Sequence, residues 1–275
     1  MLDPWWELYS ETGYKTAVEV ADLLDQSNER WKRSKSPFET DPLASALTQD
    51  MGPLLPNNEE GWSDWLARLL RQSAALVSEL FDKDVGLVPD EVIREDRLLK
   101  EEGGSRRPDI LILYPDRGFS IEVKLDDTHY RKTAETTRLT ERDYPDQEWT
   151  HTLLLPKKNI DRLRSKVDPL VRRHPKEGLQ IEWETAGPVS VMYWQDVTTA
   201  IRTLLRQGEA VDDHWAANAY LFCAAAEQQL MKFQPHPTID RMAKPANVVE
   251  TIQPITLSRI LGEQLTYLRE RMDYE

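Results

Sequence analysis

Cysteine and histidine are scarce in this chain of 275 residues, which has one cysteine, Cys223, and five histidines. A single cysteine excludes a disulfide within the chain, which is typical of intracellular proteins. Cys223 lies in the apolar run 220–226, so we expect it in the core. The histidines are never spaced as zinc ligands and no cysteine joins them, so we expect no zinc site. The phosphate-binding motifs GxGxxG and Walker A and the GxSxG turn of serine hydrolases are also missing.

Long apolar runs are missing as well. No segment approaches the roughly 18–20 apolar residues that a membrane-spanning helix needs. The first seven residues, Met-Leu-Asp-Pro-Trp-Trp-Glu, lack the basic start and apolar stretch of a signal peptide. The sequence therefore predicts a cytoplasmic protein without a membrane partner.

Positive charge is the third shortage: 35 Lys and Arg stand against 48 Asp and Glu, a net charge of −13. This balance is unusual for a protein that binds phosphates. Acidic residues dominate residues 1–90, where they would bind a protein partner or shield a site. Basic residues gather in residues 157–176, which form either a nucleic-acid-binding face or a solvated helix pair. The basic residues there are Lys157, Lys158, Arg162, Arg164, Lys166, Arg172, Arg173 and Lys176, of which we expect Lys157, Lys158 and Arg162 to bind nucleic acid.

Residues 107–125 predict a β-hairpin. Ile110–Tyr114 is apolar without a break, as in a strand that is buried on both faces. Pro115–Gly118 is turn sequence, with Pro fixed in φ and Gly able to adopt positive φ. Phe119–Leu125 alternates between apolar and polar residues, which places Glu122 and Lys124 on one face.

The register of this hairpin decides which charged side chains meet. If the turn is centred on residues 116–117, Asp109 pairs with Lys124 and lies one diagonal step from Glu122 on the same face. A β-bulge would shift this pairing by one residue. In the register without a bulge, two carboxylates and a lysine occupy one small area of the sheet.

Two neighbouring carboxylates repel each other unless a cation lies between them. Mg²⁺ suits such a pair, because it binds one or two carboxylates together with water and phosphate oxygens. Lys124 would lie beside the metal-bound water and the developing negative charge. The alternative is that Asp109 begins a strand and that Glu122 and Lys124 pair on a solvated face. The unbroken apolar strand beside them argues against full solvation.

The pattern Pro108-Asp109, a spacer of twelve residues, and Glu122-Val-Lys124 resembles the motif of the PD-(D/E)XK nuclease superfamily. The succession of strand, turn, strand, helix and strand at 151–155 is similar to that family's core. The resemblance implies a restriction-endonuclease-like α/β fold, a mixed central sheet flanked by helices, with extra N- and C-terminal helices. It also implies Mg²⁺ (or Mn²⁺) bound by Asp109 and Glu122, with Lys124 as the catalytic lysine. DNA is the expected substrate, RNA the alternative, and restriction or anti-phage defence the biological setting by analogy.

Many members of that family carry a further glutamate on an upstream helix. Here residues 57–70 predict an amphipathic helix that Asn57 or Asn58 caps. Glu59 falls on its buried stripe and is the expected metal ligand or water-orienting acid, with Glu60 as the alternative. Both acids also suit the positive end of a helix dipole, which would be a purely structural role.

Three domains follow from this interpretation: an N-terminal helical extension (1–50), a nuclease-like core (51–210) and a C-terminal helical extension packed on the core (211–275). Arg106 and Arg107, beside the motif, would either contact a phosphate or offset nearby acids. Two rival hypotheses are a catalytically idle nucleic-acid-binding or regulatory module on the same fold, and a protein-interaction module that uses the acidic N-terminal part. Because many members of the resembled family act as dimers, a homodimer is the alternative to a protein partner bound through the acidic N-terminal part. Other predicted elements are strands at 91–96 and 189–194 and helices at 14–26, 128–142 (containing Tyr130), 197–206 (capped by Asp196), 214–233 and 257–272.

Overall fold

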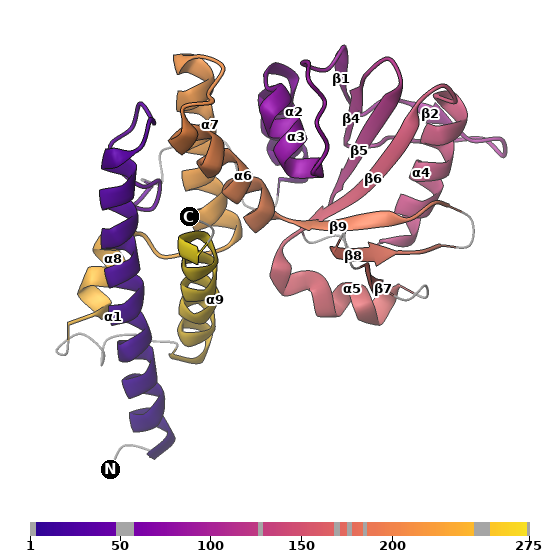
Figure 1. Cartoon of the computed structure of the whole chain (residues 1–275). Helices are drawn as coiled ribbons and strands as arrows, with labels where there is room; N and C mark the ends of the chain where they lie inside the picture. The colour runs from indigo at the N-terminus through magenta and orange to yellow at the C-terminus, as the bar shows by residue number, and fades with distance from the viewer. Residues whose placement is uncertain are drawn as a thin grey trace. The chain divides into compact units, whose positions relative to one another are not determined.

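The computed structural model describes residues 4–47, 58–125, 129–167, 171–174, 178–183, 186–244 and 254–273 (Figure 1). The chain forms two compact units. The sheet unit is Pro53–Ala200, and the helical unit combines Met1–Gly52 with Ile201–Glu275. The N- and C-terminal segments, which were predicted as two separate extensions, thus belong to one unit. The packing of the C-terminal helices on the sheet stays a prediction.

The sheet unit is built on a seven-stranded mixed sheet with the order β1-β4-β5-β6-β9-β8-β7. Strands β5, β6 and β9 run parallel, and the other neighbours pair antiparallel. A small two-stranded sheet, β2-β3, stands apart from it in the strand order. The bounds are β1 Glu91–Arg94, β2 Leu98–Leu99, β3 Ser105–Arg106, β4 Ile110–Leu113, β5 Arg117–Val123, β6 Glu148–Leu155, β7 Val171–His174, β8 Gly178–Ile181 and β9 Val189–Tyr193.

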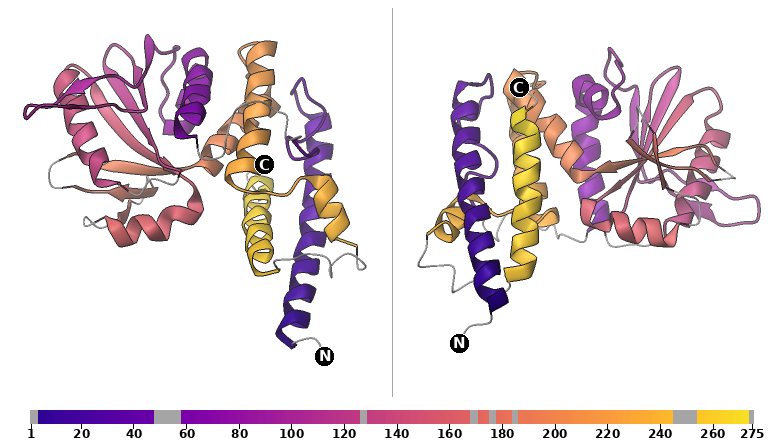
Figure 2. Two further views of the ribbon diagram at one scale, coloured as in Figure 1. Left: turned by 180° about the vertical axis from the view of Figure 1, so that it is seen from behind. Right: turned by 60° about the horizontal axis from the view of Figure 1, so that its bottom comes forward.

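Helices cover both faces of this sheet (Figures 1 and 2). On one face, Phe81 of α3 packs on Phe119 of β5 with ring centroids 4.3 Å apart. On the other, Glu141 of α4 contacts His151 of β6. The predicted α/β class, a mixed sheet flanked by helices, is confirmed. The helices of the unit are α2 Glu59–Gln72, α3 Ala74–Phe81, α4 Arg131–Asp143, the 3₁₀ turn η1 Lys157–Asn159, α5 Ile160–Lys166 and the start of α6 Trp194–Gln207.

The hairpin of β4 and β5 forms, but the predicted register is wrong by two residues. The amide of Tyr114 donates to the carbonyl of Arg117 at 2.9 Å, so the loop is Pro115-Asp116 alone. Leu113 consequently lies opposite Gly118. A shift of two residues preserves the face of every side chain. Alternation of polar and apolar residues therefore predicted the faces correctly, although it did not fix the pairing.

Gly118 is required for a different reason from the expected one. Its φ is not positive, whereas a Cβ atom at this position would lie 2.6 Å from the ring of Trp149. The glycine thus admits the Trp149 ring onto strand β5 and plays no special part in the turn.

Two helix starts show how the local sequence acts. Asn58 caps α2, since its side chain accepts from the amide of Gly61 at 3.0 Å. Helix α6 begins at Trp194, so the prediction that Asp196 precedes it as a cap is wrong. Asp196 lies in the first turn and accepts from the amide of Tyr193 at 2.7 Å, as the acid of a capping box does.

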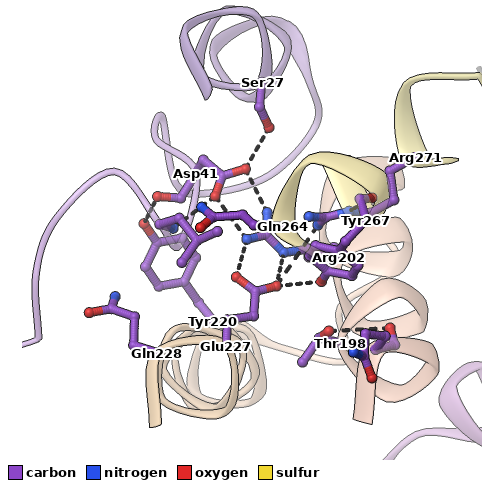
Figure 3. Close-up of polar contacts among 12 residues, drawn as sticks. Ser27, Asp41, Thr198, Arg202, Tyr220, Glu227, Gln228, Gln264, Tyr267 and Arg271 are labelled. Carbon is purple, nitrogen blue, oxygen red and sulfur yellow. Dashed lines mark hydrogen bonds and ion pairs between the residues drawn. The ribbon is translucent and has the colours of Figure 1, made fainter. Parts of the chain in front are cut away.

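The helical unit encloses a buried charge network (Figure 3). The guanidinium of Arg202 donates to both carboxylate oxygens of Asp41, at 2.6 and 2.8 Å, and to Glu227 at 2.6 Å. Tyr267 donates to the same glutamate at 2.5 Å. These side chains come from four separate segments, so the network joins the N-terminal part of the unit to its C-terminal helix. The remaining elements of the unit are α1 Pro4–Arg33, α7 Asp213–Ala225, the π-helical turn η2 Ala226–Leu230, α8 His236–Met242 and α9 Pro254–Asp273.

In the described part of the chain, no helix has the length and apolar character needed to cross a membrane.

Candidate metal and catalytic site

The charged residues of the motif lie at the carboxyl end of β5. Asp109, just before β4, accepts a hydrogen bond from the amide of Val123 at 2.7 Å. Glu59, at the start of α2, accepts from the amide of Leu125 at 2.6 Å. Two carboxylates distant in sequence from this strand end therefore bind backbone amides on either side of residue 124.

Glu122 and Lys124 form an ion pair beside these contacts, with Nζ 2.9 Å from Oε1. The two side chains are only 12% and 9% exposed, respectively. The alternative interpretation therefore predicted the ion pair correctly, but its prediction that the pair lies on a solvated face is wrong. Extending the observed register by one step puts Asp109 directly opposite Glu122, rather than on a diagonal.

The electrostatics of this cluster follow from crowding. Burial raises the pKa of Asp109 to about 7, and the nearby Glu122 and Glu59 act in the same direction. Burial alone would lower the pKa of Lys124, but the surrounding carboxylates outweigh it and raise that pKa above its ordinary value. The cluster holds three carboxylates and one lysine, so it is short of positive charge.

The donor chemistry of the cluster suits a hard divalent cation, since carboxylate oxygens are the ligands that Mg²⁺ and Mn²⁺ prefer. No group of three or more His, Cys, Asp or Glu side chains stands ready to hold a metal among the residues that the structure describes. Asp109 and Glu59 bind amides, and Glu122 binds Lys124. The residues therefore fit a cation by charge and ligand type, and binding one would exchange some of these contacts.

Helix α2 directs Glu59, and not Glu60, toward the motif. Glu60 is exposed, whereas Glu59 is partly buried and bonded to Leu125. The difference arises because Asn58 fixes the start of the helix, and with it the direction of each residue in the first turn.

The two arginines before the motif are engaged with acids. Arg106 forms an ion pair and a hydrogen bond with Glu135 of α4. Arg107 is more exposed and lies 3.5 Å from Glu95. These contacts favour the interpretation in which the arginines offset nearby acids.

The basic residues after β6 start next to the site. Lys157, Lys158 and Arg162 are exposed. Between them, the buried Asn159 donates from Nδ2 to the carbonyl of Leu125 at 2.6 Å. The strands and helices thus bring the start of this segment to the end of β5. The side chains of Arg172 and Arg173, and Lys176 as a whole, lie outside the described residues.

Sequence reasoning missed two polar features. One is Asn159, whose position directly after two lysines gave no sign of a buried contact. The other is a chain of hydrogen bonds on the face that carries Glu122: Ser120 Oγ lies 2.6 Å from His151 Nδ1, and His151 Nε2 lies 3.2 Å from Glu141. Burial lowers the pKa of His151 although Glu141 opposes this. The one indication in the sequence was that Ser120 lies two residues before Glu122 and therefore points to the same face of the strand.

Tyr130, at the start of α4, is buried in an apolar cluster with Leu153 and Leu155 of β6. This position makes it part of the core beside the site.

No protein-family model matches this chain, and no curated protein or solved structure matches it either.

Proposed function

We propose that this protein is a Mg²⁺-dependent nuclease of the PD-(D/E)XK type, with a restriction-endonuclease-like core and DNA as its substrate. The observation that carries the proposal is the meeting of Asp109, Glu122, Lys124 and Glu59 at the end of β5. These side chains come from three elements, and the resemblance gives each of them a role at one site. A setting in restriction or anti-phage defence is part of this proposal by analogy.

Each residue has a defined task in this proposal. Asp109 and Glu122 would hold the cation, and Glu59 would either join them or orient water. A bound Mg²⁺ supplies Lewis-acid stabilisation of phosphate charge and lowers the pKa of a bound water. Lys124, already beside Glu122, would place its ammonium against the negative charge that develops on the phosphate. Its burial strengthens that interaction, because water screens it less.

A nuclease assay tests the proposal. Plasmid, linear duplex, single-stranded DNA and RNA are incubated with the protein in Mg²⁺ or Mn²⁺. We expect Lys124→Ala to lower the cleavage rate about a hundredfold or more, as loss of one transition-state donor does. The matched control is Lys83→Ala, which removes an exposed lysine of the same unit.

Two results would contradict the proposal: cleavage that persists in Lys124→Ala, or no cleavage by the wild type with either metal. Binding of DNA without cleavage would instead support the catalytically idle module on the same fold.

A further inference from the structure

We propose that residues 157–166, the basic segment, bind the phosphate backbone next to the scissile phosphate. Asn159 is then the positioning residue that fixes this segment to the strand end carrying Lys124. The inference rests on the proposed function and adds to it the path of the nucleic acid beyond the cleavage site.

The first observation is a backbone link between the two regions. The peptide groups of Leu125 are held from two sides, because its amide donates to Glu59 and its carbonyl accepts from Asn159. Leu125 follows Lys124 directly, and Asn159 follows Lys157-Lys158 directly. The hydrogen bond to the basic segment is therefore made by Leu125, the residue next to Lys124.

The second observation is that helix α5 is anchored with its charges outward. Leu163 and Val167 belong to the apolar cluster that includes Leu155 of β6. Leu155 lies one step beyond the last paired position of the register, opposite Lys124. The packing therefore fixes α5 beside the strand end on the face that carries Lys124.

The third observation is the charge itself. The basic segment has five basic side chains and a single acid, Asp161, in a protein whose net charge is −13. Lys157, Lys158 and Arg162 are exposed and have no ion-pair partner within the described ranges. Arg164 lies 3.7 Å from Asp161, but that acid is 91% exposed, so the pair contributes little.

A polyanion with regularly spaced charges fits this arrangement. A phosphodiester chain that places one phosphate at the carboxylates and Lys124 needs cations for the next phosphates, because the protein as a whole carries a net charge of −13. The basic segment supplies them at the edge of the site, and Asn159 keeps their distance from Lys124 constant. An anionic membrane surface would also attract these lysines, but membrane binding does not require them to be held beside Lys124 by the hydrogen bond of Asn159 to Leu125.

Salt-dependent binding tests the contact. The anisotropy of a fluorescein-labelled 20-base-pair duplex is measured in EDTA, which prevents cleavage, over a range of KCl concentrations. We expect Lys157→Gln combined with Lys158→Gln to weaken binding about tenfold and to reduce the slope of log K against log salt by about 1 to 2, since each phosphate contact contributes about 0.9. The matched control is Lys32→Gln with Arg33→Gln, which removes two adjacent exposed charges of the helical unit.

Asn159→Ala tests the positioning role, because it leaves every charge in place. We expect the duplex to bind within about twofold of the wild type, while kcat for cleavage in Mg²⁺ falls at least tenfold. In the Asn159→Ala background, Lys157→Gln with Lys158→Gln should weaken binding as before. It should not reduce kcat further, because the effects of coupled positions are not additive. A merely structural role would lower the melting temperature and reduce binding and cleavage together.

The outcomes separate this inference from the proposed function. Lys124-dependent cleavage with an unchanged salt slope in the double lysine variant would overturn the inference and leave the nuclease proposal intact. A reduced slope without any wild-type cleavage would support the phosphate contact and reject the nuclease. Equal loss of binding and kcat in Asn159→Ala would overturn the positioning role. Lysine-dependent binding to phosphatidylserine vesicles, with DNA binding unchanged, would assign the segment to a membrane surface.

Discussion

Neutralising one carboxylate of the candidate site should stabilise the protein in the absence of metal. The pKa of Asp109 is raised to about 7, mainly by burial and by Glu122. An ordinary aspartate has a pKa of about 3.9, and a tenfold change in proton affinity corresponds to about 1.4 kcal/mol. The free energy of unfolding is therefore about 4 kcal/mol lower when Asp109 is ionised than when it is protonated.

The sign follows from proton linkage. The folded state binds this proton more tightly than the unfolded state, so the free energy of unfolding falls as the pH rises from about 4 and levels off above about 7. Asparagine at position 109 does not ionise, and its side-chain oxygen can still accept the hydrogen bond from Val123. We expect Asp109→Asn to be nearly neutral at pH 4 and to stabilise the metal-free protein by about 4 kcal/mol at pH 8.

Urea unfolding at a series of pH values, in EDTA and followed by tryptophan fluorescence, measures this effect. In melting temperature it corresponds to an increase of about 10 °C for a unit of this size. Adding Mg²⁺ should stabilise the wild type and leave the variant unchanged. Asp116→Asn is the matched control, because that carboxyl lies in the exposed turn of the same hairpin. An advantage independent of pH, or a loss of stability at pH 8, would refute the argument that the carboxylates repel each other.

Three further changes test the site and the two folded units. Arg202→Met should destabilise the helical unit by about 3–5 kcal/mol in urea unfolding, because it removes the cation that the buried Asp41 and Glu227 share. Gly118→Ala should destabilise the sheet unit by about 1–3 kcal/mol, since the new methyl group collides with the ring of Trp149, and the loss of melting temperature measures this. Glu59→Gln keeps an acceptor for the amide of Leu125, so we expect a melting temperature within about 2 °C of the wild type and a roughly tenfold weaker Mg²⁺ affinity by titration calorimetry.

Each of these has a result that contradicts it. Full stability of the Arg202 variant would mean that the buried acids take up protons at little cost. An unchanged melting temperature for Gly118→Ala would show that the Trp149 ring moves away freely. Unchanged Mg²⁺ affinity in Glu59→Gln would remove that glutamate from the set of metal ligands.

The sequence predicted the elements around the site better than their pairing. Period-two alternation identified the faces of β5, and a capping asparagine with an amphipathic stripe located Glu59. Register depends on the loop, where Pro115-Asp116 alone makes the turn, and alternation cannot distinguish registers that differ by two residues.

Contacts between distant segments were beyond the reach of local patterns. Asp41 and Arg202 are separated by 161 positions, and nothing near either residue signals the other. Asn159 reads as an ordinary polar residue in a basic run, and only the packing of α5 turns it inward. Such polar contacts depend on the assembled fold, because burial makes a partner necessary.

Because the helical unit is discontinuous in the sequence, the two units should fold in a fixed order during synthesis. All the residues of the sheet unit have been translated once position 200 is reached, and the described strands of its sheet pair with one another. Asp41, in contrast, forms its ion pair with Arg202, and Tyr267 of the same network is translated later still. Since domains generally fold as units while the chain emerges, the nascent protein should form its β-sheet before α1 can pack against helices α8 and α9, which follow position 200.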